Sequence, residues 1–157
     1  MFTTIVWATD GSRSADGALR YAKRLARDRK GRLVAVHAAE HFSGRSAPYP
    51  VLADEVEIDA KIRAQVERAR AEGIDATFMV VHGSSRGAAG MIADAARETG
   101  ADVIVTGPRH GLIAELLGEG VTQRLLHIAG CPVLVVPPER SEDREKPERE
   151  LPVGVGA

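Results

Sequence analysis

The feature that most constrains this chain is a regular alternation of short apolar segments with longer segments of helical periodicity. The short segments are rich in Val, Ile, Leu and Ala, which is typical of buried strands in a parallel sheet. They cover residues 5–9, 32–37, 76–81, 102–106 and 132–136. Parallel strands need a crossover between them, and right-handed crossovers can place helices on both faces of one sheet. We therefore predict an α/β fold in which strands and helices alternate along the chain.

The helical segments carry their own start and stop signals. Side chains that can cap a helix N-terminus stand at Ser12, at Asp54, and at Ser84 or Ser85. The first three helices are predicted to end at Lys30-Gly31, Gly73 and Gly100. A fourth helix is predicted over 121–129, and residues 42–49 form a polar loop that is long enough to cover a site.

Length and composition indicate one folded domain followed by a tail. The chain has 157 residues, and 44% of them are hydrophobic, which suits helices packed on a sheet. We expect residues 1–138 to form this domain. Residues 139–157 begin with a run of mixed charge and offer little apolar surface to offset the entropy of ordering, so we expect a disordered tail.

Charge, cysteine content and hydropathy limit which partners and which compartment we expect for this protein. A net charge of −1 gives no support for binding nucleic acid. Cys131 is the only cysteine, so an intrachain disulfide is impossible and an oxidising compartment has no support. No signal-peptide pattern is present, and no apolar run approaches the roughly 20 residues of a membrane span. We therefore expect a cytoplasmic protein with no nucleic-acid or membrane partner.

The segment 107–111, Gly-Pro-Arg-His-Gly, follows the fourth predicted strand and precedes a helix. Strand, glycine-rich loop and helix together present backbone N–H groups to an anion, usually a phosphate. Ligands of doubly wound sheets bind where the winding reverses. If it reverses between the first and fourth strands, Asp10 faces this loop across a crevice. Asp10 then has two open interpretations: a turn or cap residue, or an acceptor for a ribose hydroxyl or an adenine amino group.

The loop residues also leave alternatives open. Arg109 either pairs with a phosphate that the amides near Gly120 and Val121 cradle, or lies in a solvated turn with His110. Glu119 opposes phosphate binding unless its side chain turns outward. Thr122 is either a helix cap or a phosphate ligand. His82 and His110 fall at strand ends that a ligand could reach, and the five histidines form no cluster with metal-ligand spacing.

At these residues the chain resembles the universal stress protein family. The resemblance spans residues 3–137 and rests on 5–12, Val36-His37-Ala38, 100–107, Val121-Thr122 and 131–137. It implies a doubly wound, open, five-stranded parallel sheet with helices on both faces, which is Rossmann-like. It also implies a homodimer, often paired through the last strand. In one branch of the family it further implies ATP held between the first and fourth strands.

Members of that branch share a motif of three glycines followed by Ser or Thr. Two residues separate the first glycine from the second, and nine separate the second from the third. Counted from Gly107, the outer glycines are in register, whereas Gly111 and Thr122 each come one place late. Carried over by position, Asp10 and Ala38 flank the adenosine. The implied site comprises Ala8, Thr9, Asp10, Ala38, Thr106, Gly107, Arg109, His110, Gly111, Gly118, Gly120, Val121 and Thr122.

The sequence thus predicts a regulatory protein of universal stress protein type that binds ATP or another adenine nucleotide, with magnesium only alongside ATP. One alternative is a dimeric interaction module of the same family that binds no nucleotide. Another is a weak ATP hydrolase, which we favour less because no nucleophile and base are assembled in the sequence. We assign no catalytic residue and no metal ligand.

Overall fold

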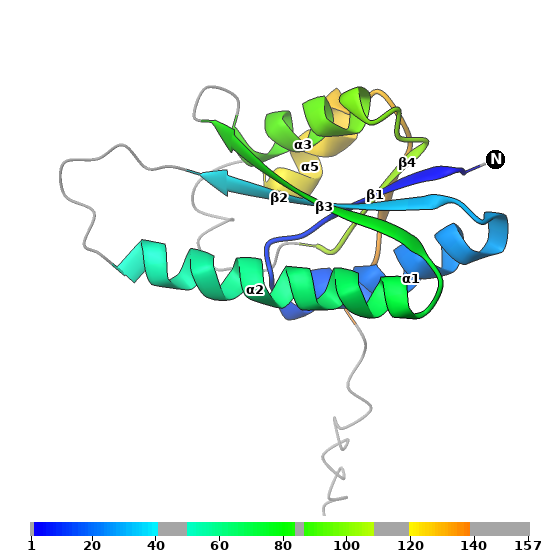
Figure 1. The fold of residues 1–157 in the computed structure, drawn as a ribbon. Coiled ribbons are helices and arrows are strands. Elements are labelled where there is room, and N and C mark those ends of the chain that lie inside the picture. Colours follow the sequence, from blue (N-terminus) through cyan, green and yellow to red (C-terminus); the bar gives the residue numbers. More distant parts are fainter. Residues whose placement is uncertain (1, 41–49, 84–86, 109–119, 139–157) are drawn as a thin grey trace, which may run out of the picture.

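A computed structural model describes residues 2–40, 50–83, 87–108 and 120–138 of the chain. Its five strands form one parallel sheet in the order β3-β2-β1-β4-β5 (Figure 1). The winding reverses between β1 and β4, so the predicted doubly wound α/β sheet is confirmed. In chain order the elements are β1 (Thr4–Ala8), α1 (Arg13–Arg29), β2 (Arg32–Glu40), α2 (Pro50–Ala71), β3 (Asp75–Gly83), α3 (Gly87–Glu98), β4 (Val103–Thr106), α5 (Val121–Ile128) and β5 (Val133–Val135).

Helices cover both faces of the sheet. Figure 1 shows α1 and α2 on one face, and α3 and α5 on the other. Successive side chains of a strand point to opposite faces, so β1 contributes to both cores. Trp7 packs with Ile62 on the α1/α2 face, whereas Val6 packs with Ile92 and Leu125 on the α3/α5 face. This burial on both sides explains why the strands are almost continuously apolar.

Most of the predicted helix ends are confirmed. The Ser12 hydroxyl accepts a hydrogen bond from the Ala15 N–H at 3.2 Å and caps α1. Lys30 ends α1 in the left-handed conformation. Gly73 and Gly100 have φ of +83° and +65°, and these left-handed angles favour glycine after a helix.

Two element boundaries differ from the prediction. Helix α2 begins at Pro50, so the start expected at Asp54 is wrong. Proline is favoured at the first helical position because its fixed φ suits the helix and its missing N–H has no partner there anyway. Strands β2 and β3 continue to Glu40 and Gly83 because they pair with each other along their whole length.

Several expectations lie outside the described residues. They are the loop over 42–49, the cap at Ser84 or Ser85, and the tail over 139–157.

The amino ends of β1 and β4 are held together by Asp102. Its Oδ2 accepts hydrogen bonds from the Thr3 N–H at 2.7 Å, the Thr3 hydroxyl at 2.9 Å and the Thr4 N–H at 2.8 Å. These bonds, led by the one from Thr4, lower the pKa of Asp102 because they stabilise the ionised carboxylate. The opposite ends of the same two strands lead into a cavity.

Candidate functional site

The cavity lies beyond the carboxyl ends of β1, β2 and β4, where the winding of the sheet reverses. It encloses about 270 Å³, close to the lower end of the range for small-molecule sites. Asp10 and Gly107 both line it, although they come from distant parts of the chain. The other lining residues are Ala8, Thr9, Ser12, Ala15, His37, Ala38, Glu55, Ile58, Ala88, Ile92, Thr106, Pro108, Val121 and Thr122.

The predicted site residues fall into three groups. The larger group lines the cavity: Ala8, Thr9, Asp10, Ala38, Thr106, Gly107, Val121 and Thr122. The second group is Gly120 alone, which directly precedes the lining residue Val121 as the N-cap of α5. The remaining four lie outside the described residues: Arg109, His110, Gly111 and Gly118. His82, which the sequence placed at a strand end, is in β3 and is not a lining residue.

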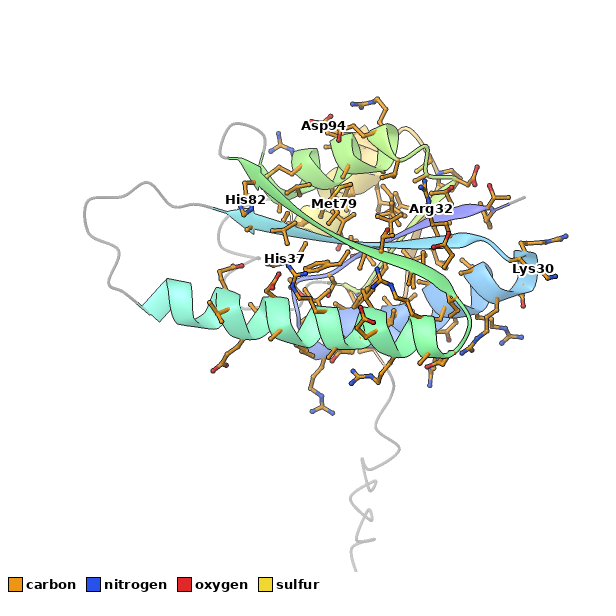
Figure 2. All side chains as sticks on the ribbon, in the orientation of Figure 1. Lys30, Arg32, His37, Met79, His82 and Asp94 are labelled. Carbon is orange, nitrogen blue, oxygen red and sulfur yellow. The ribbon has the colours of Figure 1, made fainter. Side chains whose placement is uncertain are left out.

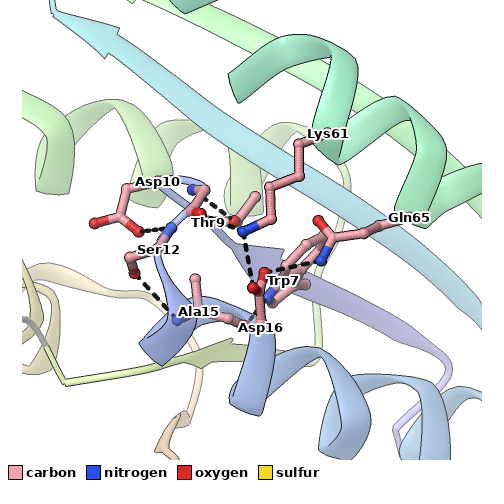
Figure 3. A network of polar contacts seen from close by, with 9 residues as sticks. Trp7, Thr9, Asp10, Ser12, Ala15, Asp16, Lys61 and Gln65 are labelled. Atoms are coloured by element: carbon pink, nitrogen blue, oxygen red, sulfur yellow. Dashed lines mark hydrogen bonds and ion pairs between the residues drawn. The ribbon is translucent and has the colours of Figure 1, made fainter. Parts of the chain in front are cut away.

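The turn between β1 and α1 forms the first wall, and its backbone is fixed by its own side chains. The Thr9 hydroxyl accepts from the Gly11 N–H at 3.2 Å, and the Asp10 carboxylate accepts from the Ser12 N–H at 3.0 Å. Figure 3 shows these residues around the turn. Asp10 therefore has the turn role that its type favours, and it lines the cavity at the same time.

Helix α2 holds this turn from behind. The Lys61 ammonium donates to the Gly11 carbonyl at 2.5 Å and to Asp16 Oδ2 at 2.8 Å (Figure 3). The Gln65 amide donates to the other Asp16 oxygen at 2.8 Å. Gly11 has φ of +76°, so the turn needs glycine at this position. The network fixes the position of a carbonyl directly next to Asp10.

The second wall is formed by the end of β4 and the start of α5. A Cβ on Gly107 would lie 2.4 Å from the Ser14 carbonyl oxygen, so glycine is needed for the close approach of two backbones. The Ser14 hydroxyl donates to the Pro108 carbonyl at 2.6 Å. The Thr122 hydroxyl donates to the Gly107 carbonyl at 3.3 Å. This wall thus depends on tight packing against α1.

The first turn of α5 faces the cavity through Val121 and Thr122. The N-cap is Gly120, which supplies no side-chain hydrogen bond, so the interpretation of Thr122 as the cap is wrong. The helix begins at Val121, so Thr122 lies within its first turn and not at its cap. N–H groups at a helix start that no side chain caps are suited to an anion.

Three polar lining residues were not predicted as site residues: Ser12, which caps α1, and His37 and Glu55. His37 is almost fully buried, and Figure 2 shows it on the side of the sheet that α2 covers. Its Nδ1 lies 3.0 Å from the Thr9 carbonyl oxygen, and its Nε2 lies 2.8 Å from Glu55 Oε2. Both ring nitrogens of His37 are therefore within hydrogen-bond distance of a partner. The one signal for Glu55 is its position one helical turn before Ile58, a residue expected on the buried stripe.

Among the residues that the structure describes, no group of three or more His, Cys, Asp or Glu side chains could hold a metal ion. No helix in the same part of the chain is both long and apolar enough to span a membrane.

Fold and cavity together define a parallel α/β protein with a cavity at its switch point. The universal stress protein family model matches residues 1–137. Universal stress protein Sll1654 of Synechocystis is 33% identical over 142 residues, which cover 87% of each chain. The chain therefore belongs to the universal stress protein family.

Two similar solved structures are complexes with nucleotides. A universal stress protein in complex with cAMP is similar to this chain with a TM-score of 0.65 and 27% identity, and the match covers 88% of this chain and 99% of that one. The universal stress protein from Archaeoglobus fulgidus in complex with dAMP is similar with a TM-score of 0.63 and 25% identity. That match covers 86% of this chain and 97% of the other.

Proposed function

We propose that this protein is a regulatory protein that binds an adenine nucleotide in the cavity between β1 and β4. The observation that carries the proposal is that Asp10 and Gly107, on separate segments, line one cavity at the switch point of the sheet. The descriptions of two similar structures as complexes with cAMP and dAMP support the choice of ligand.

The charges around the cavity indicate which end of it would hold the phosphate and which would hold the base. The uncapped start of α5, with Gly120, Val121 and Thr122, suits the phosphate. Asp10 and Glu55 line the cavity from other elements, and carboxylates there repel a phosphate but accept hydrogen bonds from amino and hydroxyl groups. In this proposal Arg109, His110, Gly111 and Gly118 belong to the phosphate end, and magnesium enters only with ATP.

Calorimetric titration with AMP, cAMP and ATP, the last with and without magnesium, tests the proposal. Ala38→Phe fills the cavity from β2 and should abolish binding, whereas Thr77→Phe, at an exposed position on the edge strand β3, should leave it unchanged. Trp7 offers a second readout: it is the single tryptophan, and its indole donates at 2.9 Å to the carbonyl of Ala15, a lining residue.

Absence of both heat and a thermal shift with every nucleotide would reject the proposal and leave the interaction module as the function. Phosphate release from ATP above a blank without protein, lost in Asp10→Ala, would instead indicate a hydrolase.

We also propose a homodimer that pairs through β5. This strand is at the edge of the sheet, where an unpaired strand can receive a second copy. Leu134 on this strand exposes 39% of its surface, and Leu126 and Ile128 on the preceding helix α5 expose 55% and 39%. Light scattering should give twice the chain mass, and Leu134→Lys should reduce it towards the monomer.

We also propose that residues 1–138 form the domain and that residues 139–157 form a charged disordered tail. We further propose that the protein is cytoplasmic. The family match ends at residue 137, which supports this boundary. Limited trypsin digestion should cleave first beyond residue 138, and cell fractionation should recover the protein with the cytoplasm.

A further inference from the structure

The carboxylate of Glu55 has one engaged oxygen and one open oxygen. Oε2 lies 2.8 Å from His37 Nε2, and this is the one hydrogen bond to the Glu55 side chain within the described residues. The side chain is 38% exposed and lines the cavity, whereas that of His37 is 5% exposed. Oε1 is therefore an acceptor at the cavity wall that no described side chain satisfies.

The contacts of His37 fix the hydrogen-bonding character of that open oxygen. The Thr9 carbonyl can only accept, so Nδ1 carries a proton and donates across the 3.0 Å contact. The second proton lies between Nε2 and Oε2, on one atom or the other. In both arrangements Oε1 carries no proton. The open oxygen of Glu55 thus remains an acceptor wherever the shared proton sits.

Glu55 also lies away from the element that suits a phosphate. It belongs to α2, which packs on β2 and β3, whereas Val121 and Thr122 belong to α5, which packs beside β5 on the other face. A nucleotide with its phosphate at α5 therefore extends its base towards α2. This step rests on the function proposed above.

An acceptor oxygen that faces position 6 of the base discriminates between purine bases. Adenine offers an amino group at position 6, whereas guanine and hypoxanthine carry a carbonyl there. A carboxylate recognises guanine best with two oxygens, one for N1–H and one for the 2-amino group. His37 occupies Oε2 and so removes that two-oxygen mode. We propose that Glu55 is a specificity-determining residue that selects a 6-aminopurine nucleotide, with His37 as the positioning residue for its carboxylate.

Titration of the full-length protein with AMP, IMP and GMP tests this assignment. We expect the wild-type protein to bind AMP at least about tenfold more tightly than IMP or GMP, as one hydrogen bond to a charged acceptor permits. Glu55→Gln should reduce the AMP/IMP ratio of affinities to about 2, because an amide can turn its NH₂ group towards a carbonyl. Glu57→Gln, at an exposed position on the same helix, should keep the wild-type ratio.

His37→Ala should also lower the AMP/IMP ratio, which a purely structural loss would not do because it weakens both nucleotides alike. A wild-type ratio near 1, tighter binding of GMP, or an unchanged ratio in Glu55→Gln would overturn the role of Glu55 while nucleotide binding stands. Failure of every nucleotide to bind the wild-type protein would overturn the proposed function together with it.

Discussion

The two walls of the cavity are built in different ways. The β1–α1 turn is held by side chains, since Lys61 bonds the Gly11 carbonyl and Asp16 bonds Lys61 and Gln65. The wall opposite is held by the contact of two backbones at Gly107, with one hydroxyl bond from Thr122 to its carbonyl. A hydrogen-bonded network can lose one member and keep its shape, whereas a backbone contact leaves no space for an added atom. The second wall should therefore be the more sensitive to substitution.

The largest effect is expected at Gly107. Gly107→Ala places a methyl group 2.4 Å from the Ser14 carbonyl oxygen, so α1 and β4 must move apart. We expect urea denaturation to show a loss of about 3 kcal/mol in the free energy of unfolding. The matched control is Gly120→Ala, where a Cβ meets nothing within 4 Å, and it should cost about 1 kcal/mol or less. Equal losses would contradict the contrast between the walls.

The polar wall should tolerate a change better. Asp16→Asn keeps the shape of the side chain but removes the charge that faces Lys61 at 2.8 Å (Figure 3). Denaturation should show a loss of about 1–2 kcal/mol, and AMP affinity should fall less than in Gly107→Ala. Asp28→Asn, an exposed residue on the same helix, is the control and should behave as wild type. A larger loss at Asp16 than at Gly107 would reverse the comparison.

The amino-end contact of Asp102 should give a smaller, pH-dependent effect, since it is exposed to solvent. Native hydrogen bonds lower the pKa of Asp102 from its ordinary value of 3.8, so ionised Asp102 stabilises the fold above that pH. This contribution disappears as the pH falls through the lower native pKa. Thermal melting should separate wild type from Asp102→Asn at pH 6 and bring them together in stronger acid. A difference that stays constant with pH would exclude this linkage.

The smallest effect is a gain. Gly17 lies within α1, and a Cβ there meets nothing within 4 Å. Gly17→Ala should stabilise the protein by about 0.5–1 kcal/mol and leave AMP affinity unchanged, because it strengthens a helix without reaching the cavity. Gly73→Ala has equal space but a φ of +83°, so it should destabilise by about 1 kcal/mol. A melting curve distinguishes the two signs directly.

The sequence predicts the sheet well because its signals are local. Apolar β-branched runs mark the strands, and Ser12, Gly73 and Gly100 mark helix ends with one residue each. The reversal between β1 and β4 also follows, because the family resemblance covers both strands. For α2 the prediction took the capping side chain of Asp54 as the start, although Pro50, directly after the predicted loop 42–49, is itself a start signal.

Most of the predicted residues that line the cavity lie at strand ends, and Val121 and Thr122 lie at the start of α5. Asp10, Ala38 and Thr106 stand where parallel strands open into the crevice, so their positions follow from topology. The position of Glu55 does not, because this residue reaches His37 from near the start of α2, a helix whose angle to the sheet no local pattern encodes. The Lys61 contact with Gly11 is of the same kind. Contacts across layers depend on packing and are absent from periodicity.

The position of β1 has a consequence for biosynthesis. Strand β1 is made before the other strands of this sheet and is the central one, and the contact of Thr3, directly before β1, with Asp102 joins residues 99 positions apart. Until β4 is made, one edge of β1 lacks its partner, and closing so long a loop is slow. The nascent chain must therefore hold an apolar strand half-paired until β4 is made, and an unpaired strand edge of this kind is prone to aggregation.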